Sequence, residues 1–107
     1  MALLHFDDGN FDSEVLQSNL PVLVDFSATW CGPCKLLHPV IEELAAEYDG
    51  RVKIGELDVE QAQKVAMRYG VMGVPTVILF KGGKIVDQTV GNTPKKTLVQ
   101  KLDKLLS

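Results

Sequence analysis

Cys31 and Cys34 are the residues whose types and spacing are best suited to chemistry, and they lie in residues 30–35, WCGPCK. They are the two cysteines of this 107-residue chain. A disulfide between them closes a loop too short to restrain the unfolded chain much, which disfavours a structural role. Two thiols this close can instead exchange electrons with another disulfide. We therefore expect a pair that cycles between dithiol and disulfide.

The two thiols are predicted to take different steps of such an exchange. An apolar stripe at helical spacing starts at Cys34, which places Cys31 just before a helix N-terminus. The N–H groups and the dipole of that terminus favour a thiolate, so we expect Cys31 to be the nucleophile, at an exposed turn. Cys34, one turn further in, should be more shielded and should resolve the mixed disulfide. Gly32 leaves room for a substrate, and Pro33 stiffens the first helical turn.

Asp25 is the second unusual residue, because it interrupts an apolar run at residues 22–26, VLVDF, that is typical of a strand covered on both faces. Burial raises the pKa of a carboxyl group, and a carboxyl tuned in this way could take the proton of Cys34 when that thiol attacks. The alternative is a carboxylate at the end of the strand that backbone donors satisfy.

Paired cysteines two residues apart also occur as half of a zinc site. The nitrogen ligands on offer are His5 and His38, and no carboxylate at ligand spacing completes a set around His38 and Cys34. We therefore expect no metal. His38 is interpreted as an exposed helix residue near the site, in preference to a group that handles protons.

The apolar pattern predicts one α/β domain over residues 1–107. Alternation of strands and helices favours a three-layer helix/sheet/helix sandwich, with a mixed sheet that has a parallel centre and an antiparallel C-terminal hairpin. Pro39 should kink the long helix without ending it. In chain order the pattern predicts a strand at 3–6, a helix at 11–16, a strand at 22–26, a helix that starts at the cysteines and runs to 48, a strand at 52–59, a helix at 62–69, strands at 76–80 and 84–90, and a helix at 94–106.

Charge and hydropathy narrow the classes of partner. The formal charge of −3, from 11 basic and 14 acidic residues, disfavours nucleic acid and anionic membranes as partners. No apolar run approaches the roughly 20 residues that span a bilayer, and the N-terminus lacks the pattern of an export signal. Because a cycling cysteine pair suits a reducing compartment, we expect a cytoplasmic protein. We also expect a monomer.

Four motifs together resemble the thioredoxin family, in that family's order and across essentially the whole chain: VDF at 24–26, WCGPCK at 30–35, GVPT at 73–76, and Gly91. The resemblance implies a thioredoxin-like fold and a protein-disulfide reductase. It implies no bound cofactor beyond the redox-active Cys31–Cys34 pair. It also implies renewal by a thioredoxin reductase, and client proteins that carry disulfides.

The resemblance further implies how substrates dock. The bond between Val74 and Pro75 should be cis, and substrate chains should lie along this loop through backbone hydrogen bonds. The residues implied to bind substrate are Trp30, Gly32, Pro33, Gly73, Val74, Pro75 and Gly91.

Two positions depart from the family's pattern. Ser27 stands where many members carry a tryptophan, a change that catalysis should survive. Glu56 stands where members often carry a lysine close to the buried aspartate. We expect this change to raise the pKa of Asp25 further, with the two carboxyls titrating as a coupled pair.

Two other functions remain open at this stage. One is a binding module of the same fold in which redox cycling is incidental, although the intact cysteine pair argues against it. The other is an oxidase or isomerase, although Gly32 and Pro33 resemble the reducing members of the family more closely.

Overall fold

The computed structural model describes residues 3–107, and the elements in this range follow the predicted order of strands and helices. The helix predicted at 11–16 is a π-helix, labelled η1. The elements are β1 (Leu4–Phe6), η1 (Asp12–Leu16), β2 (Val22–Ser27), α1 (Gly32–Glu47), β3 (Lys53–Asp58), α2 (Gln63–Arg68), β4 (Thr76–Lys81), β5 (Lys84–Val90) and α3 (Lys95–Leu106).

The sheet is mixed, as predicted. Its strands lie in the order β1-β3-β2-β4-β5, with β1, β3 and β2 parallel and the pairs β2–β4 and β4–β5 antiparallel. The antiparallel part therefore begins at the central strand β2. The β4–β5 hairpin turns through Gly82 and Gly83 with φ of +60° and +79°, the conformation that a two-residue primed turn requires.

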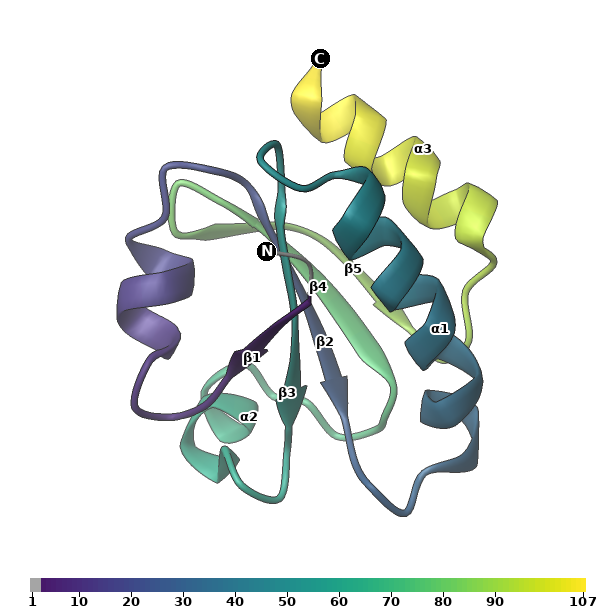
Figure 1. The fold of residues 1–107 in the computed structure, drawn as a ribbon. Coiled ribbons are helices and arrows are strands. Elements are labelled where there is room, and N and C mark those ends of the chain that lie inside the picture. Colours follow the sequence, from purple (N-terminus) through teal and green to yellow (C-terminus); the bar gives the residue numbers. More distant parts are fainter. Residues whose placement is uncertain (1–2) are drawn as a thin grey trace.

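Helices cover both faces of the sheet, which gives three layers (Figure 1). On one face α1 and α3 pack over apolar side chains that include Leu23, Ile54 and Leu79. On the other face η1 and α2 pack over a second cluster that includes Val24, Phe26 and Phe80. Successive strand residues point to opposite faces, so Asp25 shares the α1 face with Leu23.

The long helix begins directly after Cys31, where the sequence places its N-terminus. It starts at Gly32 and runs through Pro39 to Glu47. Pro33 is suited to the first turn of this helix, where its missing N–H costs no bond. Within residues 3–107, no helix combines the length and the apolar character needed to cross a bilayer.

Gly55 offers a test of how β1 and β3 are packed. A Cβ at this position would meet the Phe6 ring at 2.5 Å and the Leu4 carbonyl oxygen at 2.9 Å. We predict that Gly55→Ala lowers the free energy of unfolding by about 1–3 kcal/mol, as overpacking does, in urea titrations. The control is Gly32→Ala, whose Cβ meets no atom within 4 Å. Equal stability of the two variants would contradict this packing.

Candidate active site

The cysteine pair lies at the connection from β2 to α1, and the two sulfurs form a disulfide. Cys31 is the N-cap of α1, with an extended backbone (φ −91°, ψ 115°). The N–H of Cys34 donates to Cys31 Sγ over 3.1 Å, which is the contact a capping side chain makes with the third helical residue. In the dithiol form this N–H and the helix dipole favour a thiolate at Cys31 over one at Cys34.

The predicted difference in exposure between the two cysteines is wrong for the disulfide form. Cys31 is 4% exposed and Cys34 is 5% exposed. Cys31 is covered because Ala28 and Val74 pack against the disulfide, a contact that sequence spacing does not reveal. The two residues differ instead in what they face. Cys31 Sγ lies 3.7 Å from the carbonyl oxygen of Val74, whereas Cys34 is the cysteine that lines a neighbouring pocket.

The loop before β4 supplies the surface beside Cys31. The bond between Val74 and Pro75 is cis, as the resemblance implies. Thr76 Oγ1 donates to the Gly73 carbonyl over 2.7 Å, and the N–H of Gly91 donates to the Pro75 carbonyl over 2.8 Å. These bonds hold residues 73–76 and the end of β5 together beside the disulfide.

Exposed apolar side chains belong to the segments around this loop. Trp30 is 67% exposed, although it directly precedes the N-cap of α1. Val90, at the end of β5, is 70% exposed. Met72, next to Gly73, is 97% exposed. Apolar side chains this exposed next to a reactive group are typical of a surface that meets a partner.

Asp25 is fully buried, with 0% exposure, and neither of its carboxyl oxygens has a hydrogen-bond partner among residues 3–107. The alternative in which backbone donors satisfy this carboxylate is therefore wrong. Desolvation raises the pKa of Asp25 to about 7, the charge of Glu56 raises it too, and His38 opposes them. This is the direction expected from Glu56 at this position.

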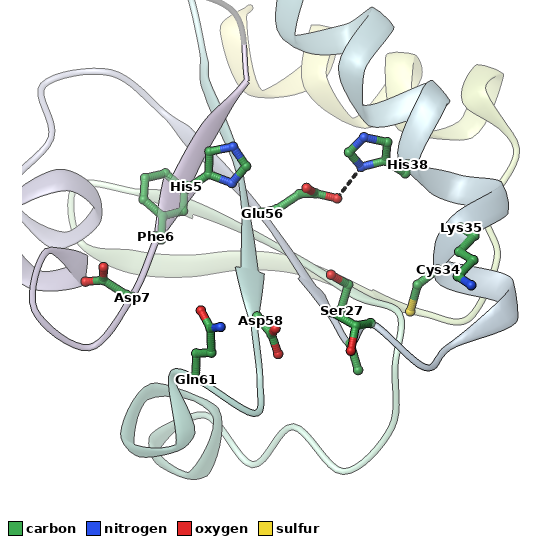
Figure 2. Close-up of a pocket in the computed structure, with 12 residues that line it drawn as sticks. His5, Phe6, Asp7, Ser27, Cys34, Lys35, His38, Glu56, Asp58 and Gln61 are labelled. Carbon is green, nitrogen blue, oxygen red and sulfur yellow. Dashed lines mark hydrogen bonds and ion pairs between the residues drawn. The ribbon is translucent and has the colours of Figure 1, made fainter.

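A pocket of about 480 Å³ opens over this end of the sheet, between α1 and the strands β1 and β3 (Figure 2). Cys34, His38 and Glu56 are among the residues that line it. His38 Nδ1 lies 2.5 Å from Glu56 Oε2, so a ring N–H donates to the carboxylate. This hydrogen bond raises the pKa of His38 above its ordinary value of 6.5.

The pair between His38 and Glu56 is the feature of the site that sequence reasoning missed. The His38 side chain is 40% exposed, in line with an exposed helix residue near the site, but its ring is also hydrogen-bonded to Glu56. One signal was available, because His38 follows Cys34 by one helical turn and so lies on the same helix face. Its partner is 18 residues away and could not be read from spacing.

The structure also bears on the metal question. Among the residues that it describes, no group of three or more His, Cys, Asp or Glu side chains is placed to hold a metal ion. The sulfurs of Cys31 and Cys34 bond to each other.

A disulfide that caps the helix after a central strand, faced by a cis-proline loop, defines the class of thiol–disulfide oxidoreductases. The family model for thioredoxin matches residues 2–104. Thioredoxin 1 of Nostoc sp. is 48% identical over 105 residues, which are 98% of each chain. A thioredoxin of Staphylococcus aureus is 51% identical over 106 residues, 99% of this chain and 100% of the relative. The chain belongs to the thioredoxin family and is a protein dithiol–disulfide oxidoreductase, a disulfide reductase.

The raised pKa of Asp25 makes stability depend on pH in a defined direction. From about pH 3.8 to about pH 7 the folded protein retains a proton that the unfolded chain has lost, so stability falls as pH rises across this window. We predict that Asp25→Asn stabilises the disulfide form by about 4 kcal/mol near pH 8 and by little near pH 4, in urea titrations. A gain of equal size at both pH values would show that Asp25 does not titrate as described.

Proposed function

We propose that Cys31 and Cys34 take unequal steps in reducing the disulfides of client proteins. The observation that carries the assignment is the capping contact, in which the Cys34 N–H donates to Cys31 Sγ over 3.1 Å. A thiolate at Cys31 keeps the hydrogen bond from the Cys34 N–H and lies at the positive end of the helix dipole. A thiolate at Cys34, inside the first turn, lacks this capping hydrogen bond. The nucleophile is therefore Cys31.

In the first step the Cys31 thiolate attacks one sulfur of the client disulfide. A bond forms between Cys31 Sγ and that sulfur, the client's S–S bond breaks, and the other client sulfur leaves as a thiolate that takes up a proton. The product is a mixed disulfide.

In the second step Cys34 resolves the mixed disulfide. The Asp25 carboxylate accepts the Cys34 proton, and the resulting thiolate attacks Cys31 Sγ. The bond to the client breaks, and its second sulfur leaves as a thiolate that is then protonated. The client gains two electrons and two protons, and the enzyme is left with the disulfide. The pKa of about 7 suits Asp25 to this exchange near neutral pH.

The docking surface comprises the seven residues implied by the resemblance. The closeness of Cys31 Sγ to the Val74 carbonyl, 3.7 Å, supports a substrate chain that lies along residues 73–75 with its disulfide at Cys31. The exposure of Trp30 supports an apolar contact beside it. The proposed set is Trp30, Gly32, Pro33, Gly73, Val74, Pro75 and Gly91.

The same cycle defines the partners. The disulfide form must be reduced by an outside donor, and a thioredoxin reductase is the class that family membership favours. Clients are proteins that carry accessible disulfides, and the exchange needs no bound cofactor. We propose that the chain works as a single-domain monomer in the cytoplasm, where the surrounding thiol pool favours net reduction.

Trapping tests the assignment of the two steps. We predict that Cys34→Ser, mixed with insulin as a probe, accumulates a mixed disulfide at Cys31, visible by mass spectrometry and released by dithiothreitol. Cys31→Ser is the matched control and should trap nothing, because Cys34 lacks the capping contact. The parent should accelerate insulin precipitation by dithiothreitol, and neither variant should.

Three outcomes would overturn the proposal. Trapping by Cys31→Ser instead of Cys34→Ser would reverse the two roles. An empty trap with Cys34→Ser would remove the mixed disulfide from the mechanism. Absence of any acceleration by the parent would favour a binding module over a reductase.

A further inference from the structure

His38 and Glu56 form a pair beside Cys34 that the catalytic cycle above does not use (Figure 2). His38 comes from α1 and Glu56 from β3, and the 2.5 Å contact between His38 Nδ1 and Glu56 Oε2 bridges the two elements. The Glu56 side chain is 17% exposed, so water screens this charge less than one on the open surface. A charge-assisted hydrogen bond of this kind holds the carboxylate toward α1.

Glu56 is also the neighbour of Asp25 in the sheet. The two residues are in register on the parallel strands β3 and β2, so their side chains lie on the same face. Adjacent strands lie roughly 4.8 Å apart, which brings the two carboxyl groups within strong electrostatic reach. No hydrogen bond joins the Asp25 carboxyl group to any group in residues 3–107. Glu56 and His38 therefore act on Asp25 through charge.

We propose that His38 is a positioning residue for the proton transfer at Cys34, acting through Glu56 on the protonation of Asp25. When the ring is protonated, its charge offsets that of Glu56, and Asp25 gives up its proton more readily. When the ring is neutral, the Glu56 charge is unbalanced and Asp25 holds its proton more tightly. This role rests on the proposed function of Asp25 as the proton acceptor for Cys34.

The remaining charged and titratable groups at this end of the sheet are few. Glu42 Oε1 lies 3.5 Å from His38 Nε2, on the side of the ring away from Glu56, and its charge adds to the raised pKa of His38. On the β4 side, Asp25 pairs with the apolar Val77. The other charged or imidazole side chains that line the pocket are His5 from β1, Asp7 directly after β1, Lys35 from α1 and Asp58 from β3.

The coupling is reciprocal, because loss of a proton from either group raises the pKa of the other. The hydrogen bond to Glu56 raises the pKa of His38, so the ring is still charged where a free imidazole begins to lose its proton. As the ring deprotonates, the pKa of Asp25 moves up. His38 and Asp25 therefore release their protons over a wider range of pH than two independent groups do.

Two substitutions of His38, one cationic and one neutral, test the proposal. His38→Lys supplies a permanent cation and should lower the pKa of Asp25, whereas His38→Gln keeps a donor without the charge and should raise it. Each shift should be about half a unit or more, measured by carbon-13 NMR titration of the Asp25 carboxyl in the disulfide form. The pH profile of insulin reduction should move in the same direction. Shifts of the same sign in both variants would point to a structural effect and overturn the proposal.

A control variant and a double-mutant cycle test whether Glu56 links His38 to Asp25. His5→Gln removes the other imidazole of the pocket, which lies on β1 in register with Glu56, and should move the pKa of Asp25 less than His38→Gln does. In a Glu56→Gln background, the change produced by His38→Gln should shrink to less than half. A full effect in that background would show that Glu56 is not the link.

Failure here is distinguishable from failure of the proposed function. If both His38 variants leave the pKa of Asp25 unmoved while the parent reduces insulin, the role of His38 is refuted and the reductase cycle stands. If the parent fails to reduce insulin, the cycle itself is wrong, whatever the NMR titrations show.

Discussion

Asp25 places a carboxyl group with 0% exposure in the central strand of the sheet, without a protein hydrogen-bond partner in the described residues. Ionising it there is costly because no water or donor replaces its hydration, and a second acid, Glu56, stands beside it in register. Asp25 is buried because β2 lies between β3 and β4 and the layer of α1 and α3 covers this face of the sheet. A group that would be an ordinary surface acid at pH 4 becomes one that exchanges its proton near pH 7. The chemistry assigned to Cys34 depends on that change.

The rest of the site follows from one strand-to-helix connection. β2 ends at Ser27 and α1 begins at Gly32, so the buried acid and the nucleophile are linked by a few residues whose ends are both fixed by the core. Cys31 then caps the helix N-terminus, while Cys34 lines the pocket together with His38 and Glu56. The cis-proline loop comes from a distant part of the chain and closes over Cys31. The two sulfurs thus differ in their surroundings although they are equally buried.

Much of this arrangement could be predicted from residue pattern because it is local. The run at 22–26 indicated a buried strand with an acid in it, and the spacing after Cys34 indicated the helix. Contacts between distant segments could not be read in the same way. The cover over Cys31 depends on how Val74 packs, and the partner of His38 depends on the register of β3 and the placement of α1.

Infrared spectroscopy of the Asp25 carboxyl tests the central claim most directly, because the C=O stretch of a protonated carboxyl is distinct from the bands of a carboxylate. The difference between the spectra of the parent and Asp25→Asn isolates this one group. The account predicts a protonated-carboxyl band near pH 5.5 that disappears as pH rises through about 7. If Asp25 is already ionised near pH 5.5, with the band lost near the ordinary value of 3.8, the acid is not tuned by burial and the proton path is contradicted.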